Sequence, residues 1–313
     1  MAEAAARIAG AVRRTPLLDV DTGQGPLWLK CENLQSMGAF KLRGATNMLA
    51  RLSPEQCAAG VVTYSSGNHG LAVTVAARHL RTHAVVVVPE TIAAVKLEGI
   101  RNAGGEVIAA GTTVLDRRHR AEQEVAKRGL TMVPPFDHEW IIAGAGSIGL
   151  EVLAQLPAVS TVYVPLGGGG LASGVATALK LSRSAIRVIG VEPAGAPKMT
   201  VSLAAGRPVT LDRTESIADG LLSLRPGDIT FAHLHRYLDA VVQVDESAIA
   251  AAVRWLFSNA RIVAEPSGAV SVAAALARMR EDPAPPVAIV SGGNVDPERY
   301  VRCLIESSRP SGF

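Results

Sequence analysis

Residues 161–181 read TVYVPLGGGGLASGVATALKL, and this stretch decides the fold class. Residues 161–164 form a short, almost continuously apolar run, which predicts a buried strand. Residues 171–181 have the periodicity of a helix, and four consecutive glycines at 167–170 lead into it. A strand, a glycine-rich turn and a helix in close succession are typical of open α/β sheets, whose ligands bind beyond the carboxyl ends of the strands.

The tetraglycine turn at 167–170 predicts a binding site for a phosphate group. Its backbone can approach an anion closely, and the helix that begins near Leu171 adds free N–H groups and the positive end of its dipole. No Lys-Ser/Thr pair follows the turn, so it is not a Walker loop. It also lacks the Gly-x-Gly-x-x-Gly spacing of dinucleotide folds. Glu192 nevertheless ends the next predicted strand, so the turn alone leaves a nucleotide ligand open.

Strands and helices alternate along most of the chain. Further strands are predicted at 60–64, 82–88, 106–110, 187–191 and 287–290, and further helices at 1–14, 70–79, around Lys96 and Ile100, at 113–128 and at 245–259. This alternation predicts parallel sheets covered by helices on both faces. The units are too many for one simple doubly wound domain, so we expect two lobes. No low-complexity linker divides them, which favours a broad interface or the insertion of one lobe into the other.

The composition excludes several classes of function. Of 313 residues 48% are hydrophobic and 19% charged, as in a packed soluble protein, and the formal net charge of +3 comes without a basic stripe, so we expect no nucleic-acid partner. No apolar run approaches the roughly eighteen residues of a membrane span, and the N-terminus does not resemble a signal peptide. The three cysteines, Cys31, Cys57 and Cys303, fit a reducing cytoplasm better than a disulfide framework.

Two more glycine-bearing turns and one lysine are candidates for a site. The turns at 65–70 (SSGNHG) and 291–294 (SGGN) each follow a predicted strand, so they can converge with the tetraglycine turn on one crevice. Lys41 lies between small residues at the start of a predicted helix, where Phe40 favours its partial burial. Burial lowers the pKa of a lysine and frees its amine for imine formation. Taken alone, Lys41 would be an ordinary surface lysine.

Seven short motifs occur in order along the chain. They are ENLQ at 32–35, FKLRGA at 40–45, SSGNH at 65–69, GGGGL at 167–171, VEP at 191–193, EPSGA at 265–269 and SGGN at 291–294. This set resembles fold-type II pyridoxal-phosphate (PLP) enzymes, within the group of serine/threonine dehydratases and serine racemases. The resemblance implies a two-lobed α/β fold like that of tryptophan synthase β, each lobe an open, mostly parallel sheet flanked by helices. We expect a large PLP-binding domain at 1–47 and 142–313, a small inserted domain at 48–141, and a homodimer.

The resemblance implies a role for each matching residue. Lys41 would hold PLP as a Schiff base and move the proton at the substrate Cα, and Phe40 would pack beside the cofactor ring. Asn68 would bind the ring hydroxyl, and Ser291 would face the pyridine nitrogen. The phosphate would be held by the amides of Gly167, Gly168, Gly169, Gly170 and Leu171. The substrate carboxylate would be held by Ser65, Ser66, Asn68 and His69.

These roles imply a lyase that removes water from a 3-hydroxy amino acid, L-threonine or L-serine, and gives a 2-oxo acid and ammonia. A neutral Ser291 at the pyridine nitrogen stabilises a carbanion less than a carboxylate would, which favours prompt loss of the β-hydroxyl over transamination. The alternative on the same scaffold is an amino-acid racemase, because Ser66 could serve as the acid and base opposite Lys41. A nucleotide-binding protein that uses the tetraglycine turn is the distant alternative.

One segment departs from the pattern of metal-activated relatives. In those relatives the resemblance implies carboxylates at positions 192 and 198 and a carbonyl at 196 as ligands of a divalent cation. Here Glu192 is present, but position 198 is a lysine, whose ammonium repels a hard cation. We therefore predict that the metal site is lost and that Lys198 pairs with Glu192 in its place. The chain ends at Phe313, soon after the last expected helix, so we expect no regulatory domain.

Overall fold

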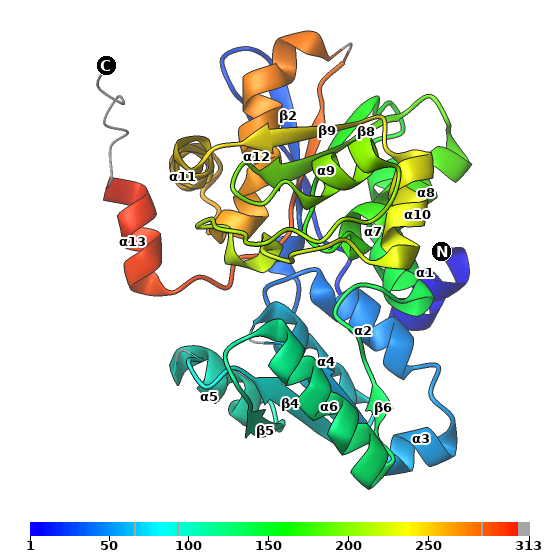
Figure 1. Ribbon diagram of the computed structural model, residues 1–313. Helices are drawn as coiled ribbons and strands as arrows, with labels where there is room; N and C mark the ends of the chain where they lie inside the picture. The colour runs from blue at the N-terminus through cyan, green and yellow to red at the C-terminus, as the bar shows by residue number, and fades with distance from the viewer. Residues whose placement is uncertain (66, 93, 283, 306–313) are drawn as a thin grey trace.

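The computed structural model describes residues 1–65, 67–92, 94–282 and 284–305, which form two lobes, each built on one sheet (Figure 1). The larger sheet has six strands in the order β1-β2-β10-β7-β8-β9, and the smaller has four in the order β5-β4-β3-β6. Only β1 and β2 pair antiparallel among the described strands. The predicted α/β class with two mostly parallel sheets is confirmed.

The larger lobe holds both ends of the described chain. Its strands are β1 (Leu17–Asp21), β2 (Pro26–Cys31), β7 (Thr161–Pro165), β8 (Arg187–Pro193), β9 (Ala240–Val244) and β10 (Val287–Val290). Its helices are α1 (Ala2–Ile8), α7 (Glu139–Gln155), α8 (Gly170–Ser182), α9 (Lys198–Ala205), α10 (Asp228–Tyr237), α11 (Glu246–Trp255), α12 (Pro266–Arg278) and α13 (Pro297–Ile305). A π-helix, Leu256–Ala260, continues α11.

Strand β7 explains why both faces of the larger sheet are covered. Tyr163 packs into an apolar cluster with residues of α11 and α12, whereas Val162 and Val164 pack into a second cluster with residues of α7, α8 and α10. Figure 1 shows the two groups of helices on opposite faces of the sheet. A strand with both faces buried needs a nearly continuous apolar sequence, which is the pattern that predicted it.

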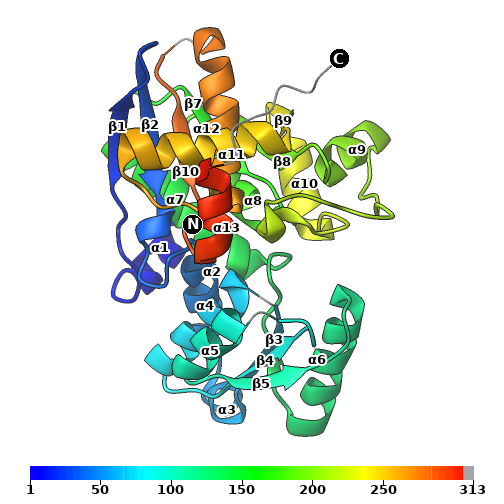
Figure 2. The same ribbon diagram turned by 90° about the vertical axis from the view of Figure 1, so that its left-hand side faces the viewer.

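The smaller lobe repeats this arrangement around β3 (Val61–Tyr64), β4 (Ala84–Val88), β5 (Glu106–Ala109) and β6 (Thr131–Met132). Its helices are α3 (Pro54–Ala59), α4 (Asn68–His79), α5 (Ala94–Asn102) and α6 (Val114–Arg128). Figure 2 shows α4 and α5 on one face of this sheet and α6 on the other. Helix α2 (Lys41–Leu49) lies between the lobes, because Leu42, Ala45 and Met48 pack with residues of both α4 and α7.

Most predicted elements are present; several have ends shifted by one or two residues, and two differ by more. The N-terminal helix ends at Ile8 rather than Arg14, since the chain turns at Ala9 and Gly10. The helix predicted to Asn259 leaves α-geometry after Trp255. The hairpin β1–β2 was not predicted. The four strands of the smaller sheet fall within 48–141, although the limits of the inserted domain stay a prediction. No helix in the described ranges is long and apolar enough to cross a membrane.

Candidate active site

Lys41 is the first residue of α2, as the sequence predicted, and it is half-buried. Its Nζ donates to the carbonyl oxygen of Pro135 over 2.6 Å and lies 5.2 Å from the centre of the Phe40 ring. Burial lowers the pKa of Lys41 to about 8. About a tenth of this amine is therefore neutral at pH 7, far more than for an unperturbed lysine, and the neutral amine is the form that can act as a nucleophile or a base.

The turn at 291–294 lies beside Lys41. The backbone N–H of Phe40 donates to the carbonyl oxygen of Ser291 over 3.0 Å, and Ala39 pairs with Gly292 in an isolated β-bridge. Ser291 is buried, and its hydroxyl donates weakly to the carbonyl oxygen of Ser267 over 3.5 Å. This hydroxyl is consequently held by no strong partner within the described residues.

The tetraglycine turn leads into α8, with Gly169 as the N-cap in a left-handed conformation at φ +104°. A side chain at Gly168 would collide with the ring of Phe136, so only glycine permits this close approach. The backbone N–H groups of Gly167–Leu171 have no acceptor among the described residues. Unpaired amides at a helix N-terminus form a ready site for an anion.

Asn68 connects the two lobes. It is the first residue of α4 in the smaller lobe, and its Nδ2 donates to Oε1 of Glu265 over 2.7 Å. Its Oδ1 accepts from Nδ2 of Asn294 over 2.8 Å, and the same Nδ2 also donates to the carbonyl oxygen of Met37 over 2.9 Å. Burial, together with the nearby charge of Asp219, raises the pKa of Glu265 to about 8.

The remaining predicted residues lie at the turn before α4. The hydroxyl of Ser65 accepts from the N–H of Gly67 over 3.3 Å. Ser66 lies outside the described residues. His69 is buried, and its Nε2 lies 3.1 Å from the carbonyl oxygen of Val133. Burial and the charge of Lys41 lower the pKa of His69 to about 3, so the imidazole is neutral near pH 7.

Sequence reasoning missed the segment 133–138, which we call the return segment because it leads from β6 back to α7. The carbonyl of Val133 accepts from His69 and that of Pro135 from Lys41, while the Phe136 ring packs against Gly168. The run Pro-Pro-Phe-Asp-His at 134–138 was the available signal. Two prolines fix an extended backbone directly after a strand, which suits a connection that crosses between lobes.

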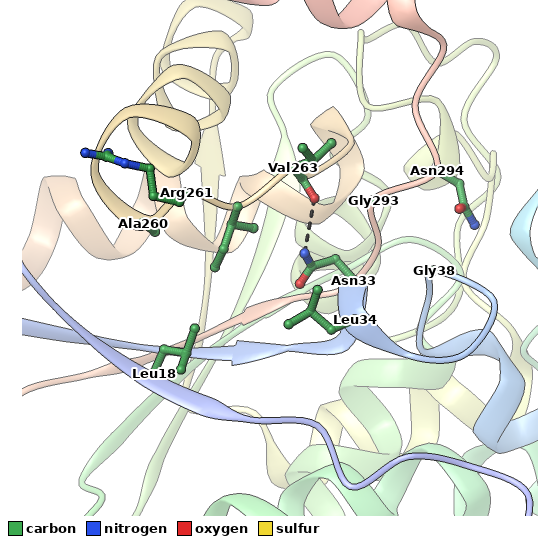
Figure 3. Close-up of a pocket in the computed structure, with 10 residues that line it drawn as sticks. Leu18, Asn33, Leu34, Gly38, Ala260, Arg261, Val263, Gly293 and Asn294 are labelled. Carbon is green, nitrogen blue, oxygen red and sulfur yellow. Dashed lines mark hydrogen bonds between the residues drawn. The ribbon is translucent and has the colours of Figure 1, made fainter.

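A cavity of about 410 Å³ lies beside the site rather than at Lys41. Figure 3 shows Asn33, Leu34 and Val263 on its wall, with the amide of Asn33 donating to the Val263 carbonyl over 3.1 Å. Gly38 and Asn294 form its border toward the site. None of the residues predicted to bind cofactor or substrate lines it.

The predicted ion pair between Lys198 and Glu192 is confirmed. Both side chains are fully buried, and Nζ lies 3.2 Å from Oε1 of Glu192. The ammonium also donates to the carbonyl oxygens of Ala196 over 3.0 Å and Leu166 over 2.9 Å. Lys198 thus binds both of the oxygen groups that the resemblance assigns to a cation, and the loss of the metal site stays a prediction.

The family model and the most similar sequences point to the same family of proteins. The family described as "Pyridoxal-phosphate dependent enzyme" matches residues 8–292. The L-threonine ammonia-lyase of Thermotoga maritima is 39% identical over 99% of this chain and 78% of its own length. The biosynthetic L-threonine dehydratase IlvA of Pasteurella multocida is 42% identical over 79% of this chain, which spans only 48% of that relative.

The fold comparison agrees with the sequence comparison. The structure of maize serine racemase superposes with a TM-score of 0.92 at 38% identity and covers 96% of this chain and 94% of its own. The relatives thus include both the lyases and the racemases that the motifs indicated. The family match over residues 8–292 and the fold lead to one conclusion: the chain belongs to the pyridoxal-phosphate dependent enzymes.

Proposed function

We propose that this protein is a lyase that removes water from L-threonine or L-serine and releases a 2-oxo acid and ammonia. The observation that carries the proposal is Lys41, whose half-buried amine has a pKa near 8. Such an amine can both attach to an aldehyde and take a proton from the substrate Cα. The likeness to a protein named L-threonine ammonia-lyase supports the substrate class.

The residues around Lys41 fit PLP. The unpaired amides at 167–171 provide donors for its phosphate. Asn68 still has one N–H on Nδ2 for the ring hydroxyl, since the other is used by Glu265. The weakly held hydroxyl of Ser291 suits the pyridine nitrogen. PLP supplies an electron sink for the negative charge that develops at Cα when the α-proton leaves.

The chain's own groups account for the other steps. The free N–H groups at the start of α4, near Ser65, Asn68 and His69, suit the substrate carboxylate. Lys41 takes the α-proton and returns a proton to the β-hydroxyl, which leaves as water. One water molecule then hydrolyses the released unsaturated amine to the 2-oxo acid and ammonia. At the pyridine nitrogen we place the neutral hydroxyl of Ser291 rather than a carboxylate. The negative charge that develops at Cα is therefore drawn only weakly toward that nitrogen. This favours prompt elimination over transamination.

Incubation of the purified protein with L-threonine and with L-serine tests the proposal. We expect 2-oxo acid and ammonia in equal amounts, and neither from a Lys41→Ala variant. Formation of the D-isomer without 2-oxo acid would instead identify a racemase, the alternative that the likeness to maize serine racemase keeps open. No product of either kind would contradict both functions.

We also propose that the protein is a cytoplasmic homodimer. Three free cysteines support a reducing compartment. Exposed apolar side chains around the cavity of Figure 3, among them Leu18, Leu34 and Val263, support a contact with a second copy. Light scattering should give twice the mass of one chain, and a single-chain mass at micromolar concentration would contradict the dimer.

A further inference from the structure

The carboxylate of Asp137, in the return segment, caps the first turn of α10. Its Oδ2 accepts from the N–H of Asp228 over 3.0 Å, and its Oδ1 accepts from the N–H groups of Ile229 over 3.0 Å and Thr230 over 3.1 Å. A helix leaves four amides unpaired at its start, and one side chain from outside the helix satisfies three of them here. The N-cap itself is Gly227, which has no side chain to do so.

Helix α10 in turn holds the tetraglycine turn. The hydroxyl of Thr230 donates to the carbonyl oxygen of Gly168 over 2.7 Å, and the N–H of Gly227 approaches the same oxygen at 3.3 Å. Thr230 is fully buried, and a side chain at Gly169 would lie 2.7 Å from its Cβ. Figure 1 shows α10 beside α8, whose first turn begins at Gly170. The start of α10, which Asp137 caps, thus holds the tetraglycine turn in place through Gly168.

The direction of the Gly168 carbonyl has a consequence for the next amide. In a trans peptide the C=O of one residue and the N–H of the next point in opposite directions. The bond from Thr230 fixes the C=O of Gly168 toward α10, so the N–H of Gly169 points away from α10. That N–H has no acceptor in the described part of the chain, and it is one of the donors that would hold the phosphate.

We propose that Asp137 is a positioning residue for the phosphate of the cofactor. It orders the start of α10, Thr230 then fixes the Gly168 peptide, and the Gly169 N–H is thereby aimed before the cofactor arrives. The inference rests on the proposed binding of PLP at residues 167–171. The contacts of the phosphate therefore depend on Asp137, whereas the contacts of the ring with Asn68 and Ser291 do not.

Binding of PLP and of pyridoxal, which lacks the phosphate, separates this role from a general structural one. Cofactor-free protein is titrated with each compound, and the dissociation constants are compared for the wild type and Asp137→Ala. We expect the variant to bind PLP on the order of tenfold to a hundredfold more weakly, because the Gly169 N–H is then no longer held toward the phosphate. Its affinity for pyridoxal should stay within about twofold of the wild type.

Asp228→Ala is the matched control. Asp228 carries a carboxylate in the first turn of the same helix, but it is 73% exposed and its side chain pairs only with Arg225 among the described residues. This variant should keep both affinities. Thr230→Val, which removes the donor to Gly168 and retains the side-chain shape, should reproduce the loss for PLP and keeps the test decisive if Asp137→Ala does not fold.

Two results would overturn the inference. One is an unchanged PLP affinity in folded Asp137→Ala, or in Thr230→Val where Asp137→Ala does not fold. The other is an equal loss of PLP and pyridoxal binding, which would assign Asp137 a structural role alone. Failure of the wild-type protein itself to bind PLP is a different outcome, because it would contradict the proposed function from which this inference starts.

Discussion

The guanidinium of Arg43 donates to both oxygens of Glu151, over 2.6 Å and 2.9 Å, and to both oxygens of Glu32, over 2.8 Å each. Lys30 completes the cluster, with its Nζ 2.5 Å from Glu151. Arg43 is fully buried and follows Lys41 by two residues in α2. The network therefore joins the helix that carries the proposed catalytic amine to β2 and α7.

Substitution of Arg43 by methionine should lower the free energy of unfolding by about 3–5 kcal/mol, because it leaves the fully buried carboxylate of Glu32 without its charged partner. Urea unfolding measures the change. Arg118→Met is the control, since Arg118 is exposed and forms an i,i+4 pair with Glu122 that should contribute only about 0.3–0.5 kcal/mol. Equal effects of the two substitutions would show that burial of the network adds nothing.

The fold was predictable where burial leaves a pattern in the sequence. Residues 287–290 were predicted as a strand and form β10 with the same limits, since both faces are covered and no polar residue interrupts the run. The hairpin β1–β2 has no such pattern, because β1 lies at the edge of the sheet and alternates apolar residues with Asp19 and Asp21. An exposed edge strand is hard to distinguish from a loop by periodicity.

The candidate site was predictable as a set of motifs but not as a set of contacts. Lys41, Asn68 and Ser291 stand in recognisable turns and Glu265 in the EPSGA motif, but the motifs did not show that Lys41 contacts Pro135 or that Asn68 contacts Glu265. Lys41 meets Pro135 across 94 positions, and Asn68 meets Glu265 across 197. Periodicity and turn signals report on neighbours in the chain, so they carry no information about such pairs.

Lys198→Met should lower the free energy of unfolding by about 3–5 kcal/mol, because Glu192 would stay buried without a counter-charge. The control is Lys180→Met, which breaks a partly exposed pair between Lys180 and Asp239 and should cost at most about 1 kcal/mol. Urea unfolding of both variants gives the comparison. A Lys198→Met protein as stable as the wild type would mean that the ammonium does not stabilise this position.

Treatment with a chelator should leave the lyase activity unchanged, and added magnesium should not raise it. The reason is that Lys198 already donates to the carbonyl of Ala196 and pairs with Glu192, and its positive charge repels a divalent cation. Initial rates before and after chelation, with and without magnesium, measure this. Restoration of lost activity by magnesium would contradict the proposed replacement of the metal.

Attachment of PLP to cofactor-free protein should depend on pH with a midpoint near the pKa of Lys41, about 8. A lysine is nucleophilic only when neutral, and the neutral fraction rises as pH passes upward through its pKa. The attachment rate should therefore level off above about pH 9, whereas the rate for an unperturbed lysine would still be rising at about pH 10.4. Absorbance follows the reaction, and Lys41→Arg should show no attachment. A rate that still climbs at pH 10 would contradict the shifted pKa.

His69 should make the protein less stable in mild acid. Its pKa is about 3 in the folded protein and 6.5 when unperturbed, so between these values the unfolded chain binds one more proton than the folded one. From this residue, the free energy of unfolding should fall by about 1.4 kcal/mol for each pH unit below about 6.5. His69→Gln, which keeps a donor for the Val133 carbonyl, should remove that part of the slope.

The comparison uses urea unfolding at several pH values, and the slope against pH rather than the stability at one pH is the result. His79→Gln is the control, because His79 is exposed at the end of the same helix, α4. This variant changes no buried group, so it should keep the wild-type slope. If the two variants showed the same slope, the acid sensitivity would have to come from groups other than the buried imidazole.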